Sequence, residues 1–219
     1  MHGKITALTL QKRNRNRINV YLDGEFAFGL TRIVAAWLQI GQELSEEKIA
    51  ELQAADAEET AYQRALLLLN SRPRTRAEIA RNLQNQNIPE NIQQAIFERL
   101  QRSGLLDDAA FARAWIANRE EFRPRGQNAL RYELRQHGVE EHIIQQVITE
   151  NPADEYEQAV RAAEKTARKL SGSDAQTFRR KLGGFLARRG FNYETSARVI
   201  AHYWHTLSPN SEEFENEEI

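Results

Sequence analysis

Residues 130–139 read LRYELRQHGV, and two other stretches of the chain repeat this pattern. They are IARNLQNQNI at residues 79–88 and LGGFLARRGF at residues 182–191, so the copies begin 51 and then 52 residues apart. In each copy two apolar residues lie four positions apart, which is one face of a helix. Asn or Gly follows four residues later, and these types enter the left-handed conformation most readily and so end helices. Each copy therefore predicts a helix followed by a tight turn.

The repeat extends on both sides of these stretches. An apolar residue follows each turn at once, and the positions four and eight residues further on continue one helical face, as Ile88, Ile92 and Ile96 do in the first copy. A third helical pattern precedes each copy, so the repeating unit contains three helices and is roughly 50 residues long. We expect Ile79, Leu83 and their equivalents to be buried. At Gly138 and Gly190 we expect a positive φ, and Asn tolerates that conformation at the first turn.

A fixed period over several copies indicates an array of like modules rather than one globular core. We predict a mostly α fold in which three tandem three-helix modules form an extended array. The predicted modules span residues 58–106, 107–152 and 153–208. The acidic segment 209–219 is expected to be disordered.

The first 57 residues are predicted to form a separate N-terminal domain. Residues 5–11 and 18–22 alternate apolar and polar, and Asp23-Gly24 is a strong hairpin-turn signal before residues 25–28. The pattern predicts a three-stranded antiparallel meander, with Ile5, Ala7 and Thr9 or their neighbours on one face. Short helices should follow, one over residues 31–38 and one capped by Ser45 through Leu52.

Composition restricts the class of protein. The 219 residues have a formal net charge of −1, 28% charged residues and no cysteine, which excludes disulfides and thiolate metal sites. No stretch approaches 18 apolar residues, and the N-terminus lacks a signal-peptide pattern. The sequence therefore predicts a cytoplasmic protein, expected to be a monomer without membrane association.

The small net charge conceals separate charged blocks. Residues 161–198 carry 10 basic and 3 acidic residues, and residues 1–40 carry 6 basic and 2 acidic residues. Such blocks can contact phosphate or an acidic protein groove, although solvated helix faces would give the same pattern. The candidate partner- or DNA-binding residues are Lys12, Arg13, Arg15, Arg17, Arg72, Arg74, Arg123, Arg125, Arg131, Arg135, Arg179, Arg180, Lys181, Arg188 and Arg189.

Nothing in the sequence indicates catalysis. There is no P-loop, no nucleophile elbow and no zinc-protease motif. His202 and His205 lie three apart on a predicted helix, but two ligands without a nearby carboxylate or Cys make a weak metal site. Three tryptophans, Trp37, Trp115 and Trp204, are interpreted as core residues. We predict no enzyme activity, no metal and no cofactor.

Several runs, taken in order, resemble the bacterial RecX regulatory family. Residues 104–119 contain GLLDD, FA, Trp115 and Arg119 at the family's spacing, and residues 126–139 and 185–191 match its second and third repeats. Residues 21–26, YLDGEF, resemble the N-terminal extension that many members carry. The resemblance covers roughly residues 1–206, and Asn87 departs from the Gly usual at the first turn.

The resemblance implies a modulator, usually an inhibitor, of the RecA recombinase, and hence a role in recombination and DNA repair. Members lie along the helical groove of the RecA–DNA filament, and some also bind single- or double-stranded DNA. The alternative is a direct DNA-binding protein, because three-helix units with a turn at Gly or Asn can act as helix-turn-helix modules. Glu140 and Glu141 weigh against this, since they begin a helix with the wrong charge for phosphate.

Overall fold

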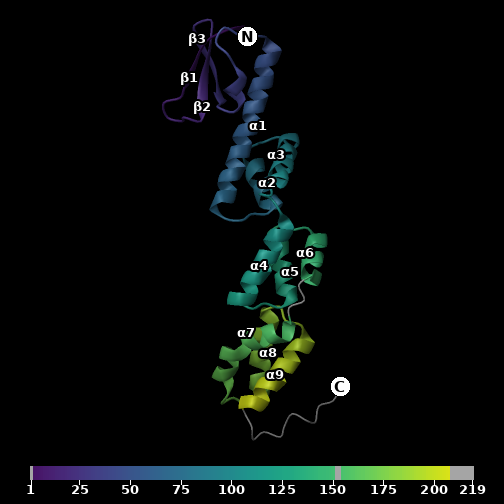
Figure 1. The fold of residues 1–219 in the computed structure, drawn as a ribbon. Coiled ribbons are helices and arrows are strands. Elements are labelled where there is room, and N and C mark those ends of the chain that lie inside the picture. The colour runs from purple at the N-terminus through teal and green to yellow at the C-terminus, as the bar shows by residue number, and fades with distance from the viewer. Residues whose placement is uncertain (1, 151–153, 208–219) are drawn as a thin grey trace. The chain divides into compact units, whose positions relative to one another are not determined.

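The computed structural model describes residues 2–150 and 154–207, which form a small sheet followed by helices (Figure 1). The predicted acidic tail and the predicted boundary at residues 152 and 153 lie outside the described residues. The chain divides into two compact units, Met1–Arg74 with Ile79–Leu106, and Thr75–Glu78 with Asp107–Ile219. The second unit contains both the second and the third module, so contacts between these two modules can be described.

The N-terminal sheet has four strands in the order β3-β2-β1-β4. The predicted meander is confirmed, and it consists of β1 (Gly3–Leu10), β2 (Arg17–Leu22) and β3 (Glu25–Thr31). Asp23 and Gly24 join β2 to β3 with φ of 49° and 93°, as a tight hairpin turn requires. The fourth strand, β4 (Glu43–Leu44), pairs with the start of β1, and its two residues are too few to show an alternating pattern.

The predicted face of β1 is wrong beyond its first residue. The register with β2 shifts between Ile5 and Ala7, which moves the following side chains to opposite faces. Ile5 is buried and Leu8 packs against the same core, whereas Thr9 is exposed. The sequence carries a trace of this bulge, since the apolar alternation changes phase at the adjacent pair Ala7 and Leu8.

The predicted helix over residues 31–38 is also wrong, because only one 3-10 turn, η1 (Val34–Trp37), forms there. Thr31 still belongs to β3, and Ala35 occupies the buried position under the turn. The side chain of Trp37 is 88% exposed rather than part of the core. A single short turn can bury only one of its faces. The small Ala35 side chain occupies that face against the core of the sheet, so Trp37 is left exposed.

Helix α1 runs without a break over Glu46–Ser71, where we expected one helix through Leu52 and a separate helix preceding the first repeat copy. Ser45 is its N-cap, as predicted, and accepts from the Lys48 N–H over 3.2 Å. The sequence between the two expected helices, QAADAEETA, is rich in Ala and Glu and contains no Gly or Pro, so helix propensity carries the helix through.

The three-helix modules are confirmed. After α1 the first module has α2 (Arg76–Asn85) and α3 (Glu90–Arg102). The second has α4 (Asp108–Phe122), α5 (Gln127–Gln136) and α6 (Glu141–Glu150). The third has α7 (Glu155–Leu170), α8 (Ala175–Arg188) and α9 (Tyr193–Leu207).

Each module encloses its own apolar core. The equivalent residues Leu83, Leu134 and Leu186 each have 0% exposure, which confirms the repeat alignment. Ile92 and Ile143 are only partly buried. The next apolar positions along the last helices, Ile96, Val147 and Val199, are fully enclosed.

The turns after these leucines have the predicted geometry. Asn87, Gly138 and Gly190 adopt φ of 56°, 78° and 82°. In all three the N–H of the next residue donates to the carbonyl of the buried leucine, over 3.1 to 3.2 Å, which is the hydrogen bond of a Schellman helix end. The tight turn predicted from Asn and Gly is therefore confirmed in every copy.

Candidate functional site

The second and third modules meet where two glycines lie against each other. The Gly126 N–H donates to the Arg189 carbonyl oxygen over 2.9 Å. A Cβ atom on Gly126 would overlap the Gly190 carbonyl group, and a Cβ atom on Gly190 would overlap the main chain of helix α5. Glycine at both positions is what allows this approach. This contact, formed by residues 123–129 and 189–191, is called the joint below.

Three arginines gather at the joint. Arg123 and Arg125 flank Pro124 in the α4–α5 loop, and Arg189 Nη1 donates to the Pro124 carbonyl oxygen over 3.2 Å. The Arg189 guanidinium also lies over the Phe185 ring, 4.8 Å from its centroid. Burial, together with the positive charges of Arg125 and Arg123, lowers the pKa of Arg189. A guanidinium nevertheless stays protonated in proteins, so three positive charges are held close together.

One carboxylate lies beside this group and is already shared. Glu133 Oε2 accepts from Arg119 Nε and from Trp115 Nε1, each over 2.8 Å. Its other oxygen, Oε1, is 3.5 Å from Arg125 Nε, which is buried and has no hydrogen bond. Trp115 is partly buried, with the Arg119 guanidinium 4.2 Å from its ring centroid. Glu133 therefore neutralises no more than one of the surrounding guanidiniums, and the joint keeps a positive excess.

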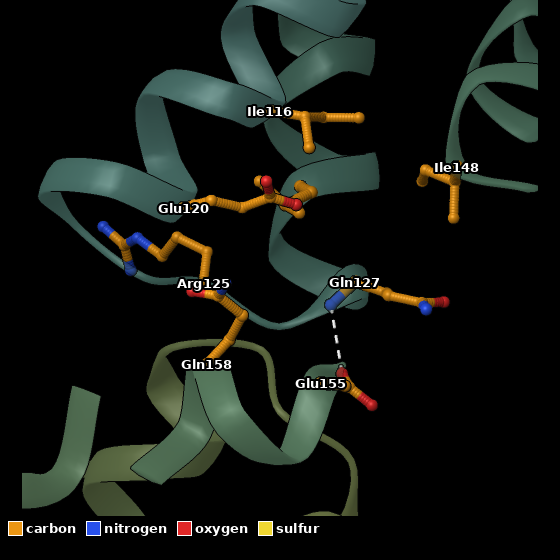
Figure 2. Close-up of a pocket in the computed structure, with 8 residues that line it drawn as sticks. Ile116, Glu120, Arg125, Gln127, Ile148, Glu155 and Gln158 are labelled. Carbon is orange, nitrogen blue, oxygen red and sulfur yellow. Dashed lines mark hydrogen bonds between the residues drawn. The ribbon is translucent and has the colours of Figure 1, made fainter. Parts of the chain in front are cut away.

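A small cavity lined by polar and apolar residues lies beside the joint (Figure 2). Its volume is about 20 Å³, too small for a metabolite. Across it the Gln127 N–H donates to Glu155 Oε1 over 3.1 Å, a bond drawn in Figure 2. Burial raises the pKa of the Glu120 carboxyl, and the charge of Arg161 opposes that rise. The lining residues are Ile116, Glu120, Arg125, Gln127, Leu130, Ile148, Glu155 and Gln158.

A larger and open groove crosses helices α7 and α8 of the third module. Its volume is about 450 Å³, and the residues that line it include four cations and no carboxylate. They are Thr166, Lys169, Leu170, Arg180, Lys181, Gly184, Phe185 and Arg188. Phe185 lines this groove and also lies under Arg189. Phe185 therefore links the lining of the basic groove to Arg189 of the joint.

Sequence reasoning found most of these cations and missed two features. Arg180, Lys181 and Arg188 were candidates, whereas Lys169 was not singled out. Lys169 lies on a different helix, and only packing of α7 against α8 shows that it shares the groove. The proximity of Arg123 and Arg125 to Arg189 also depends on tertiary contacts across more than 60 residues.

Other candidate residues of the second unit are occupied within the protein. Arg135 forms a two-pronged pair with Glu141, over 2.7 and 3.0 Å. The hydrogen bonds and charge of Glu141 raise the pKa of Arg135. Arg131 Nη1 donates to Gln145 Oε1 over 2.7 Å. Arg179 is exposed on α8, next to Arg180 but outside the groove lining.

The first unit holds the remaining candidates. Lys12, Arg13 and Arg15 lie in the loop between β1 and β2, and the loop residues 12–16 are all exposed. Arg17 is held inside the unit by an ion pair of 2.7 Å with the buried Asp56 carboxylate.

Arg72 and Arg74, the repeat equivalents of Arg123 and Arg125, bond to nearby carbonyl groups. Arg74 Nε donates to the Leu68 carbonyl over 3.1 Å, and Arg72 Nη1 donates to that of Pro73 over 3.1 Å. Whether any of these residues meets a partner stays a prediction.

Some contacts of the joint have counterparts one repeat earlier, within the second unit. The Thr75 hydroxyl donates to the His137 carbonyl over 2.6 Å, and the Arg76 N–H donates to Asp108 Oδ1 over 2.8 Å. Gly126 and Gln127, 51 positions after Thr75 and Arg76, use their N–H groups on equivalent partners. The repeat therefore includes these connecting contacts, while the arginine cluster belongs to the later copy.

Residues 2–150 and 154–207 contain neither a metal-binding cluster nor a membrane-spanning helix. In that part of the chain no three His, Asp or Glu side chains are placed to share a metal ion. None of its helices combines the length and apolar character needed to cross a bilayer.

Comparison with known proteins gives the relationship of the chain. Four family models match it in order: the regulatory protein RecX N-terminal domain at residues 3–45, and the first, second and third RecX three-helix domains at residues 61–100, 107–148 and 153–200. The chain belongs to the RecX family. This confirms the resemblance drawn from the repeat motifs.

Individual relatives agree with the family models. Regulatory protein RecX of Limosilactobacillus reuteri is 31% identical over 193 residues, which is 87% of this chain and 73% of the relative. That of Streptomyces coelicolor is 35% identical over 148 residues, 66% of this chain and 78% of the relative. A crystal structure of regulatory protein RecX matches with 30% identity and a TM-score of 0.75, over 90% of this chain and 98% of that one. RecX from Lactobacillus salivarius, at 23% identity and a TM-score of 0.63, supports the fold alone.

Proposed function

We propose that this protein regulates the RecA recombinase by binding in the groove of the RecA–DNA filament, where it lowers ATP turnover and strand exchange. The observation that carries the proposal is the match of four RecX models along almost the whole described chain. The family is regulatory by name, and RecA as the target comes from what the family resemblance implies. Cytoplasmic location and a role in recombination and DNA repair are parts of the same proposal.

The architecture suits a regulator that works by contact alone. A helical filament presents the same groove at every subunit, and a chain of similar modules can engage it at several places. Linked weak contacts raise the effective concentration of each module at its own position, so total affinity exceeds that of any one module. Binding of this kind either occupies positions that the second DNA strand needs or holds neighbouring subunits together.

The basic groove of α7 and α8 is the surface we assign to this contact. Its four cations face solvent without a carboxylate in the lining, in contrast to Arg131 and Arg135, which are satisfied within their own module. The groove would meet acidic side chains of the filament or phosphates of its DNA. Charged clefts of one sign also steer an oppositely charged partner toward the surface.

A binding titration tests the proposal. Fluorescently labelled protein would be titrated with RecA alone, with DNA alone, and with the filament assembled on single-stranded DNA in the presence of a slowly hydrolysed ATP analogue. The proposal expects the tightest binding to the filament. Equal affinity for bare DNA and for the filament would instead favour the alternative, a direct DNA-binding protein, which the same basic groove supports.

A further inference from the structure

We infer that the joint is a binding site for a phosphate group of a nucleic-acid backbone, held by Arg123, Arg125 and Arg189, and that a bound phosphate fastens the second module to the third. This site goes beyond the proposed function, because it requires neither RecA nor an effect on recombination. Its experiment contains no recombinase, so a failure of the proposed function leaves the site untouched, and the reverse also holds.

The first support is the way the three guanidiniums are brought together. Arg189 is fixed twice, since its carbonyl accepts from the Gly126 N–H and its side chain donates to the Pro124 carbonyl. Pro124 lies between Arg123 and Arg125, so the bond places Arg189 beside both. Like charges repel at short range, and the main-chain contacts keep these three residues adjacent in spite of that repulsion.

The second support is the shortage of negative charge around them. In the described part of the chain neither Arg123 nor Arg189 forms an ion pair with a carboxylate. Glu133 faces Arg125 but is also bonded to Arg119 and Trp115. Two other acids lie nearby, Glu155 and Glu120, and they line the cavity beside the joint.

The acids on the other side of the joint do not fill this need. Glu155 accepts from the Gln127 N–H and from Asn192 Nδ2, over 3.1 and 2.7 Å. Glu120 lines the cavity with Arg125, and within residues 2–150 and 154–207 its carboxylate forms no ion pair with Arg123, Arg125 or Arg189. The joint therefore presents unsatisfied guanidinium donors to an incoming anion.

The chemistry favours phosphate over a protein carboxylate. Guanidinium groups match the oxygens of phosphate with paired N–H donors, and several of them can share one phosphate. One backbone phosphate, like one carboxylate, carries a single charge on two free oxygens, so the preference rests on the number and arrangement of the cations around the site. The basic groove of α7 and α8 is linked to the joint by Phe185, which lines the groove and lies under Arg189. A line of cations next to the cluster fits a polymer with regularly spaced charges better than one acidic side chain.

Occupancy of the site would stabilise the joint. Arg123 and Arg125 belong to the second module and Arg189 to the third, so one phosphate would bridge the two. Without the anion, repulsion between the guanidiniums opposes the contact at Gly126 and Gly190. Nucleic-acid binding and the rigidity of the two-module unit are coupled in this way, since a ligand that binds one state stabilises that state.

The experiment is hydrogen exchange on the full chain, read at the joint. The Gly126 amide donates across the joint, so its exchange rate reports opening there. Exchange in the peptides over residues 123–130 and 187–193 would be measured with no ligand, with a single-stranded oligodeoxynucleotide, and with the same oligonucleotide carrying an uncharged methylphosphonate backbone. A polyglutamate peptide of matched charge is the fourth arm.

We expect the charged oligonucleotide to slow exchange at the joint at least threefold, and the methylphosphonate and polyglutamate arms to leave it unchanged. R123Q should remove most of that protection and lower the salt dependence of oligonucleotide binding by about one unit of slope, as loss of one phosphate contact does. The Arg123 side chain is exposed and bonds to no neighbour among residues 2–150 and 154–207, so R123Q preserves the fold. R102Q, at an exposed position on α3, is the matched control and should behave as the wild type.

Three results would overturn the inference. One is tight binding of the oligonucleotide with unchanged exchange at the joint, and another is equal protection by polyglutamate, which would assign the site to a protein carboxylate. The third is full protection in R123Q. R189K tests the geometry, because lysine keeps the positive charge but lacks the guanidinium that donates to the Pro124 carbonyl. The oligonucleotide should slow exchange at the joint of R189K less than it does in the wild type.

Discussion

Three glycine substitutions separate the free-energy cost of a steric collision at the joint from the cost of a positive φ. Gly126 has an ordinary φ of −73°, so Gly126→Ala adds a methyl group against the Gly190 carbonyl without backbone strain. Gly104 has a φ of 66°, and a Cβ atom there would meet open space, so Gly104→Ala adds strain without a collision. Gly190 combines a φ of 82° with a collision against α5, so Gly190→Ala carries both costs.

The magnitudes follow from these differences. Overpacking against a rigid main chain costs about 1–3 kcal/mol, which we assign to Gly126→Ala. The left-handed region costs an L-residue about 1–2 kcal/mol, which we assign to Gly104→Ala. Gly190→Ala should therefore lose about 2–5 kcal/mol, the sum of the two ranges. A loss of that size is a large fraction of the stability of an ordinary domain.

Urea unfolding measures these values in the second unit. Trp115 and Trp204 are its two tryptophans, partly and fully buried, while the exposed Trp37 of the first unit changes its environment little on unfolding. Tryptophan fluorescence therefore reports Gly126→Ala and Gly190→Ala, and circular dichroism reports Gly104→Ala. If Gly126→Ala unfolds at the wild-type midpoint with an unchanged slope, the close approach of the two modules is absent in solution and the reasoning is refuted.

Three other predictions use the same structure. Gly138→Val should destabilise the second unit by about 1–2 kcal/mol, because a β-branched residue is a poor fit at a φ of 78°, whereas Asn87→Gly should be neutral or slightly stabilising; an unchanged midpoint for Gly138→Val in urea would contradict this. Changing Arg180, Lys181 and Arg188 to Glu should weaken filament binding, and the loss of affinity relative to the wild type should be smaller at high salt. Changing the exposed Arg81 and Arg102 of the first unit to Glu serves as the control, and equal binding by both variants in anisotropy titrations would remove the groove from the mechanism. Asp174 caps α8, and its hydrogen bond with Thr177 lowers the pKa of its carboxyl. The stability that this cap contributes is therefore present above the unfolded pKa and is lost as pH falls through the lower folded value. The thermal midpoint of Asp174→Ala should differ from that of the wild type near pH 7 and approach it near pH 2, and a difference that stays constant with pH would contradict the assignment.

The helical repeat was predictable because local chemistry and tertiary packing agree in it. Leu83, Leu134 and Leu186 mark the buried face of one helix, and Asn or Gly four residues later ends that helix by its conformational preference alone. No distant residue is needed for either inference. The same holds for Asp23-Gly24, whose two positive φ values define the hairpin.

The errors occurred where a distant part of the chain decides the outcome. The bulge in β1 follows from pairing with β2, and the exposure of Trp37 follows from a single turn that places Ala35 against the sheet. Helix α1 is an exception with a local cause, because no Gly or Pro interrupts it at the expected domain boundary.

The candidate site shows the same division. Its cations are visible in the sequence, yet nothing local indicates which of them share a surface. Arg135 pairs with Glu141 six residues away, and Arg189 reaches the loop that contains Arg123 and Arg125. Tertiary contacts, both within a module and between modules, decide which arginine is paired inside the protein and which stays available to a ligand.

The central claim is regulation of RecA, and the steady-state ATPase rate of RecA on single-stranded DNA tests it most directly. We expect the rate to fall with added protein and, if each copy engages several positions of the groove as proposed, to saturate at a ratio well below one protein per RecA subunit. The variant with Arg180, Lys181 and Arg188 changed to Glu should require a higher concentration for the same effect. An ATPase rate that stays constant at saturating protein, with filament formation intact, would contradict the account.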